Sequence, residues 1–205
     1  MRPLEGPARR RPPAAVKIAF SPIAYTCGRD LSDTLDMHAV VRLNREELVQ
    51  RWRALGADPQ APEFYELDEF GELVVSPAPT NQHELVAVEV AKALERELGP
   101  RSSAAVSVLT DCGVLRPDAT WMPLERWSQC ARLDPLPFAP DICVEVLSPS
   151  NTRAEMQKKV GAYLGAGARE VILVDLNGRK AFFGAEGERV ASAFGLQLVL
   201  PADLF

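Results

Sequence analysis

The sequence predicts an α/β domain built around a mixed β-sheet. Segments with helical spacing of apolar residues alternate with short apolar runs along most of the chain. The run at 170–176 (EVILVDL) is almost continuously apolar, which is typical of a strand buried on both faces. Asn177-Gly178 follows it as a hairpin signal, so antiparallel pairing is expected beside this buried strand.

Three helices are predicted because each segment starts at a capping residue and ends at a stop signal. Glu47 and Glu155 stand three residues after their caps, which predicts two reciprocal capping boxes. In the first helix, apolar residues share one face at Leu48, Trp52 and Leu55. The predicted helices begin after Asn44, Thr80 and Thr152 and end near Gly56, Leu98 and Gly165.

The predicted strands are short segments bounded by proline, glycine and other turn residues. Pro117 indicates an edge position or a bulge inside its strand. Residues 123–140 carry four prolines and are expected to form a loop. The predicted strands are 63–67, 71–76, 103–109, 114–122, 141–147, 170–176 and 179–184.

The N-terminal segment, residues 1–36, is expected to be an irregular or disordered arm before a domain at 37–205. Its Arg9–Arg11 and Pro12-Pro13 run does not suit a packed element. A start codon assigned too early, with Met37 as the true start, explains the same pattern. No apolar run approaches the roughly 20 residues of a membrane helix, and a secretory signal is not evident, so a cytoplasmic location is expected.

Composition narrows the function without deciding it. The net charge of −5 argues against a strong nonspecific nucleic-acid binder, although carboxylates that hold divalent cations allow an acidic protein to act on nucleic acid. The four cysteines form no CxxC pair, so a structural zinc site is not expected and reduced thiols are.

Two strands each carry a carboxylate among apolar neighbours. In 141–147 (DICVEVL), alternation places Ile142, Val144 and Val146 on one face and Glu145 on the other. A buried Glu145 needs a partner, whereas a solvated strand end does not. Asp118 follows Pro117 in the string RPDATW, where a turn aspartate is the simpler alternative.

The helix after Glu145 offers a cation. Lys159 projects about 60° from Met156, at the border of the apolar face, and Lys158 projects roughly 160° away, toward solvent. A lysine that only covers apolar surface is the alternative for Lys159. Together, two carboxylates and a lysine are the groups needed for metal-assisted phosphodiester hydrolysis, because hard divalent cations take oxygen ligands.

Two long strings resemble the Uma-type "putative restriction endonucleases" of the PD-(D/E)XK nuclease superfamily, over roughly residues 40–184. They are FYELDEFGELVVSPAPTNQHELV, and RPDATW followed by DICVEVLSPSNTRAEMQKKVGAYLGAGAREVILVD. The resemblance implies a restriction-endonuclease-like core, with a central mixed β-sheet flanked by helices. Ala168, Ile172 and Leu176 depart from the usual family residues, but only at packing positions.

The resemblance also assigns roles by position. Asp118 and Glu145 match the two acidic residues of the superfamily, with the backbone carbonyl of Val146 as a further metal ligand. Leu147 stands where the superfamily lysine usually lies, and Lys159 matches a lysine moved to the following helix.

Two further residues match the family outside this core. Glu72 matches a glutamate that can be a further metal or water ligand. His83 matches a family histidine to which no role is assigned, and a helix-terminal or core histidine explains it equally well.

The function implied is a Mg²⁺-dependent (or Mn²⁺-dependent) endonuclease that hydrolyses DNA. Lys158 is a candidate DNA contact, and a homodimer is expected because cutting both strands needs two active sites. One alternative is a nucleic-acid-binding or regulatory module with weak catalysis on the same fold. A metal-free hydrolase using Ser148 or Ser150 is disfavoured because no GxSxG motif is present.

Overall fold

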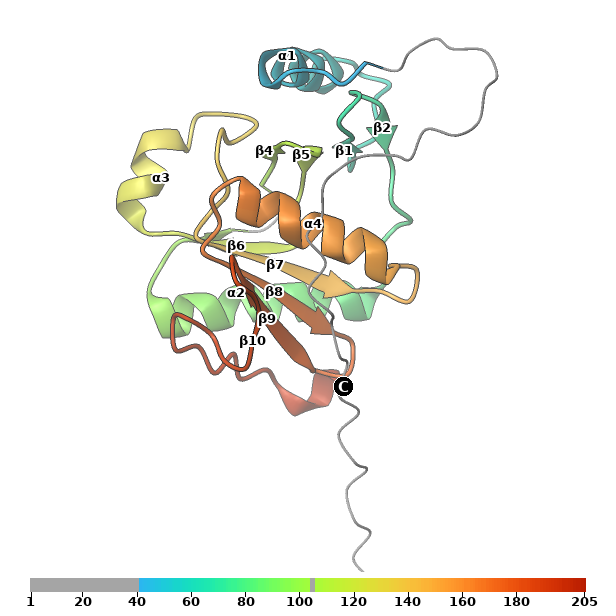
Figure 1. The fold of residues 1–205 in the computed structure, drawn as a ribbon. Helices are drawn as coiled ribbons and strands as arrows, with labels where there is room; N and C mark the ends of the chain where they lie inside the picture. Colours follow the sequence, from blue (N-terminus) through green and yellow to red (C-terminus); the bar gives the residue numbers. More distant parts are fainter. Residues whose placement is uncertain (1–40, 104–105) are drawn as a thin grey trace, which may run out of the picture.

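In the computed structural model, which describes residues 41–103 and 106–205, two β-sheets and four helices form the domain (Figure 1). The predicted arm at 1–36 lies outside the described residues. The larger sheet has six strands in the order β10-β9-β8-β7-β6-β3, and a four-stranded antiparallel sheet has the order β2-β1-β5-β4. The predicted α/β fold with a mixed sheet is therefore confirmed, and the second sheet is an addition to it.

The mixed sheet is built around two parallel strands, β7 (Ile142–Leu147) and β8 (Glu170–Asp175). Helix α4 (Arg153–Gly165) connects them, as expected for a parallel pair. The neighbouring strands pair antiparallel. They are β3 (Ser102–Ser103), β6 (Ala119–Trp121), β9 (Lys180–Gly184) and β10 (Gly187–Arg189).

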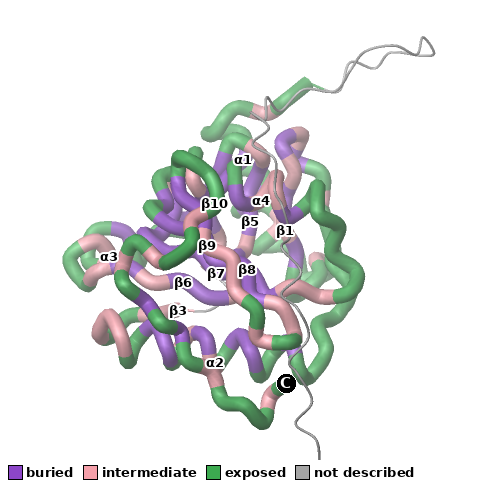
Figure 2. Tube along the Cα trace, turned by 60° about the horizontal axis from the view of Figure 1, so that its bottom comes forward, coloured by how far each residue is buried: buried purple, intermediate pink, exposed green. Residues whose placement is uncertain are grey.

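Helices cover both faces of this sheet. Val86, Val90 and Leu94 of α2 (Asn81–Leu98) pack against the Ile142, Val144 and Val146 face of β7. On the opposite face, Met156, Val160 and Tyr163 of α4 pack against Cys143 of β7 and its neighbours. The buried centre lies between these two helices (Figure 2). The alternation predicted for β7 is confirmed, so Glu145 faces α4.

The second sheet carries the predicted hairpin. It contains β1 (Glu66–Leu67), β2 (Leu73–Val74), β4 (Val108–Thr110) and β5 (Gly113–Leu115). Leu48 and Trp52 of α1 (Arg45–Gly56) pack on Tyr65, Leu67 and Val114. Gly113 has φ 114°, and a Cβ there would lie 1.9 Å from the carbonyl oxygen of Leu67. Glycine thus allows β5 to approach β1 closely.

Three expectations need correction. The strand expected at 103–109 corresponds to the end of β3 and the start of β4, which lie in different sheets. The strand expected at 114–122 is likewise two strands, β5 and β6, in different sheets. Pro117 lies between them, so its missing N–H costs neither sheet a ladder hydrogen bond. The expected loop at 123–140 contains a helix, α3 (Leu124–Cys130). A short 3₁₀ helix at Ala202–Leu204, for which no prediction was made, follows the last strand.

The helix signals of the sequence are confirmed. Asn44 with Glu47 and Thr152 with Glu155 form the two reciprocal capping boxes, and the side chain of Thr80 accepts from the N–H of His83. Within residues 41–103 and 106–205, no helix combines the length and apolar character of a membrane span.

Candidate active site

Glu145 is a buried carboxylate with two side-chain partners from helix α4. Glu145 is only 5% exposed. The hydroxyl of Tyr163 donates to Oε1 at 2.6 Å, and Nζ of Lys159 lies 3.3 Å from both carboxylate oxygens. Because β7 directs Glu145 toward α4, the strand alternation and the helix face determine this meeting point together. Of the two alternatives left by the sequence, the paired and buried carboxylate is the one observed.

Lys159 points inward, as predicted, whereas Lys158, which was expected to point to solvent, is half-buried beside Glu69. The Lys159 side chain is 19% exposed, and its Nζ also lies 2.8 Å from Oε1 of Glu66. The Lys158 side chain is 39% exposed, and its Nζ lies 2.7 Å from Glu69 on the β1–β2 turn. Lys159 therefore bridges two carboxylates, and Lys158 ties the surface of α4 to the hairpin.

Asp118, Glu145, Lys159 and Tyr163 form, together with Glu66, a group of interacting side chains that is called the carboxylate cluster below. Glu66 is the member that the sequence did not predict. Its Oε1 accepts hydrogen bonds from Nζ of Lys159 and from the backbone N–H of Arg116, at 2.8 and 2.7 Å. Glu66 lies on β1, so its contact with Lys159 links the smaller sheet to the helix that covers the larger one. A charged residue within the apolar string FYEL was the available signal.

Glu72, the glutamate named from the family resemblance, is placed differently. Its side chain is exposed, and its backbone N–H donates to Oδ1 of Asp68 at 2.9 Å. The hairpin glutamate that contacts Lys159 is thus Glu66.

Asp118 is held against the backbone of β7. Its Oδ2 accepts from the N–H of Val146 at 2.7 Å and lies 3.4 Å from Nε2 of His83. The same His83 nitrogen lies 3.0 Å from the Val146 carbonyl oxygen. An Nε2–H tautomer satisfies both acceptors, and hydrogen bonding to Asp118 raises the pKa of His83 although burial opposes it. Asp118 and His83 therefore hold both polar groups of the Val146 backbone.

The charges of the cluster influence one another. The pKa of Glu145 is raised to about 7, chiefly by burial; the Lys159 charge lowers this pKa, and the charges of Asp118 and Glu66 raise it. Burial alone would lower the pKa of Lys159, but the Glu145 and Glu66 carboxylates raise it above its ordinary value. Lys159 is thus held as an ammonium, and a second cation near Glu145 would further favour its carboxylate form.

The serine alternative finds no catalytic pair. The hydroxyls of Ser148 and Ser150 lie 2.8 Å apart, and Ser148 also bonds Oδ1 of Asn151 in the turn before α4. The His83 ring contacts Val146 and Asp118 instead. These serines close a turn, which explains the SPSN string without chemistry.

The donors at the end of β7 suit a hard cation. Among the described residues, no three His, Cys, Asp or Glu side chains form a ready metal-binding group. Asp118 and Glu145 supply two carboxylates, and Val146 supplies a carbonyl oxygen next to Glu145 in the chain. Mg²⁺ is commonly bound by one or two carboxylates and completes its octahedron with water and substrate phosphate, so this donor set fits it.

The arrangement of helices around a mixed sheet is the restriction-endonuclease-like fold expected from the sequence. The chain belongs to the Uma2 family, described as "Putative restriction endonuclease", which matches residues 46–195. The predicted family is thereby confirmed, and its description supports a nuclease function in general terms.

A solved structure supports the same fold. The crystal structure of a "putative nuclease belonging to DUF820" from Anabaena variabilis is similar, with a TM-score of 0.54 and 20% sequence identity. The match covers 74% of this chain and 96% of that chain. At this identity the similarity concerns the fold alone. A search of curated proteins returns no significant match.

Proposed function

We propose that this protein is a Mg²⁺-dependent or Mn²⁺-dependent endonuclease that hydrolyses DNA phosphodiester bonds. The observation that carries the proposal is the buried Glu145, whose carboxylate meets Lys159 and Tyr163 on the otherwise apolar α4 face of β7. A purely structural role does not require a carboxylate there, because an apolar side chain would avoid the cost of burying charge.

Asp118 and Glu145 would hold the divalent cation, together with the carbonyl oxygen of Val146. The bound metal would supply Lewis-acid activation of the phosphate and a more acidic water. Asp118 is positioned for this task because the Val146 N–H fixes its Oδ2 at 2.7 Å. His83 fixes the Val146 carbonyl in turn, at 3.0 Å. A cation held here would also offset the negative charge that the acidic chain would otherwise direct against DNA.

Lys159 would position the attacking water and stabilise the negative charge that develops on the phosphate oxygens. A fixed cation in a water-poor site performs this role well because it needs no reorganisation during the reaction. Glu66 and Tyr163 support it: Glu66 holds the ammonium from the second sheet, and Tyr163 holds Glu145. Cleavage of both strands of a duplex would need two active sites, so we include a homodimer in the proposal.

Glu145→Gln tests the metal site directly. The full chain should bind Mg²⁺ or Mn²⁺ in calorimetric titrations and should cleave duplex or single-stranded DNA only with the metal present. Glu145→Gln should lose both properties while keeping its fold, because a hard-cation site depends on anionic ligands. Glu125→Gln on α3 is the matched control. Unchanged metal binding in Glu145→Gln would exclude Glu145 as a ligand.

A second candidate function is a nucleic-acid-binding module with weak catalysis. It is favoured by one observation: Lys159 is already paired with two carboxylates, at 2.8 and 3.3 Å. DNA binding by the wild type without any metal-dependent cleavage, on duplex and single-stranded substrates, would favour this candidate over the nuclease.

A further inference from the structure

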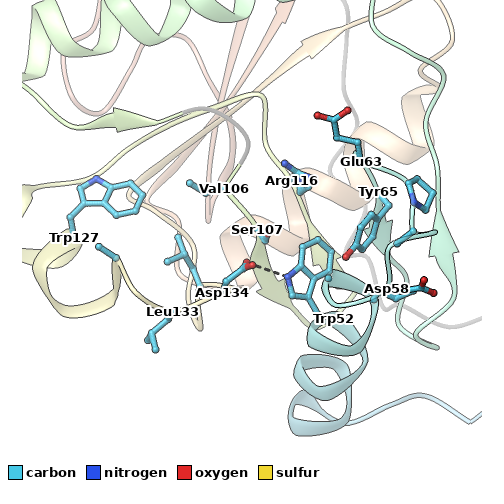
Figure 3. A pocket seen from close by; sticks show the side chains of 16 residues that line it. Trp52, Asp58, Glu63, Tyr65, Val106, Ser107, Arg116, Trp127, Leu133 and Asp134 are labelled. Atoms are coloured by element: carbon cyan, nitrogen blue, oxygen red, sulfur yellow. Dashed lines mark hydrogen bonds between the residues drawn. The ribbon is translucent and has the colours of Figure 1, made fainter.

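A pocket lies beside the carboxylate cluster, between α1, α3 and the start of β1. Its volume is about 510 Å³, within the range of roughly 300–1,000 Å³ that is usual for small-molecule sites. Figure 3 shows Trp127 at one end and the pair of Trp52 and Tyr65 at the other, with Asp134 between them. The role proposed for the cluster does not use this pocket.

Three aromatic side chains, those of Trp52, Tyr65 and Trp127, are among the residues that line the pocket, and each is held by contacts of its own. The rings of Trp52 and Tyr65 are 4.7 Å apart, and both residues are less than 10% exposed. Nε1 of Trp52 donates to Oδ1 of Asp134 at 3.2 Å, and Nε1 of Trp127 donates to the carbonyl of Arg101 at 3.0 Å. The orientation of these three aromatic side chains is therefore set before a ligand arrives, and Trp127 is the most exposed of them.

The charged residues that line the pocket are mainly acidic. They are Asp58, Glu63 and Asp134, with Arg116 as the basic residue among them. This balance disfavours a phosphate. It favours a flat ligand that stacks on aromatic rings and presents N–H donors, as the exocyclic amino groups of adenine, cytosine and guanine do.

The pocket and the cluster share the same two chain segments. Tyr65 lines the pocket, and the next residue, Glu66, contacts Lys159. Arg116 lines the pocket, its backbone N–H donates to Glu66 at 2.7 Å, and Asp118 follows two residues later. A nucleotide whose base occupies the pocket would thus have its sugar-phosphate backbone near the cluster.

We propose that this pocket binds an unpaired, amino-bearing nucleobase of the DNA substrate. The proposal rests on the nuclease function proposed above and adds a substrate class: DNA with a base displaced from the stack near the cut. A base inside an intact duplex could not enter such a pocket.

Free nucleosides test the pocket separately from the nuclease. In saturation-transfer NMR titrations of the full chain, deoxyadenosine, deoxycytidine and deoxyguanosine should bind at least about fivefold more tightly than thymidine. Trp127→Ala should weaken every nucleoside by about fivefold or more, whereas Trp127→Phe should retain most binding. Asp134→Asn keeps an acceptor for Trp52 but removes the charge, so it should reduce the preference over thymidine. Asp203→Asn, on the C-terminal 3₁₀ helix, is the matched control.

The results separate the two proposals because nucleosides contain no phosphodiester and need no metal. No nucleoside binding, or equal binding of all four with the wild type, overturns the base pocket. An unchanged preference in Asp134→Asn also overturns it. If DNA is nevertheless cleaved, the proposed nuclease function stands alone. Selective nucleoside binding without cleavage supports the pocket and counts against the nuclease.

Discussion

Nζ of Lys159 lies 3.3 Å from each carboxylate oxygen of Glu145, although the lysine comes from helix α4 and the glutamate from strand β7. Leu147, two residues after the glutamate, stands where the family resemblance places the usual lysine, and it packs with the apolar residues beneath α4. The positive charge beside Glu145 therefore comes from helix α4 and not from strand β7. The position of the Lys159 ammonium depends on how α4 packs on the sheet.

Lys159→Ala should lower the rate of single-turnover DNA cleavage with Mg²⁺ by about 10²-fold or more, on the scale of one lost electrostatic donor. Lys158 carries the same charge at the adjacent position but is paired with Glu69 at the surface. Lys158→Ala should therefore affect mainly DNA binding and its salt dependence, by about one ionic contact at most. Saturating enzyme removes binding losses from the measured rate.

Equal cleavage rates for the two lysine variants would refute the assignment of Lys159 as the catalytic lysine. Circular dichroism of both variants is the necessary control, because Lys159→Ala leaves Glu66 and Glu145 without their shared cation. Lys159→Met retains the apolar stem and removes only the charge, so it should lose activity to a similar extent.

The hairpin glutamates provide a second test. Glu66→Gln should weaken cleavage and lower stability, because Lys159 loses one of its two anionic partners although the side-chain oxygen is retained. Glu72→Gln should have the smaller effect on both, since the side chain of Glu72 is exposed. Cleavage rates and urea unfolding measure the difference. A larger loss of activity in Glu72→Gln would restore Glu72 as the functional glutamate.

Local patterns predicted the elements that position the site. The alternation of β7 depends on a period of two residues, and the inward side of α4 depends on a period of 3.6, so both faces could be assigned from the sequence. The capping residues Asn44 and Thr152 fixed the helix starts for the same local reason. These periods are sufficient to place Glu145 and Lys159 on facing surfaces of the strand and the helix.

Nonlocal pairing could not be predicted in this way. Glu66 contacts Lys159 across 93 positions, and only the packing of the smaller sheet against α4 brings them together. Helix α3 was not predicted because its N-cap, Pro123, makes no side-chain capping hydrogen bond and because prolines surround the helix. The division between β5 and β6 also depends on which sheet each strand joins, which the local apolar pattern does not encode.

Tyr163→Phe should lower the free energy of unfolding by roughly 1–3 kcal/mol, because it removes a buried hydrogen bond to the Glu145 carboxyl group. Tyr163 is fully buried, and its hydroxyl lies 2.6 Å from Oε1 of Glu145. Tyr65→Phe is the matched control, since Tyr65 lines the pocket and its hydroxyl should contribute less to stability. Urea unfolding of both variants gives the comparison. Equal decreases in the free energy of unfolding would show that the hydrogen bond to Glu145 contributes no more to stability than the Tyr65 hydroxyl does.

His83 should matter through the backbone of Val146. Its Nε2 contacts the Val146 carbonyl at 3.0 Å, while Asp118 accepts from the Val146 N–H, so the histidine and the aspartate hold one peptide segment from two sides. His83→Ala should destabilise the fold by roughly 1–3 kcal/mol because a buried carbonyl loses its donor. It should also weaken Mg²⁺ binding, because Asp118 and Val146 would no longer be held in place.

His83→Gln can still present an N–H and should recover part of both losses. Urea unfolding and calorimetric Mg²⁺ titration measure the two effects separately. Loss of stability without any change in metal affinity would make His83 a core residue, independent of the proposed site.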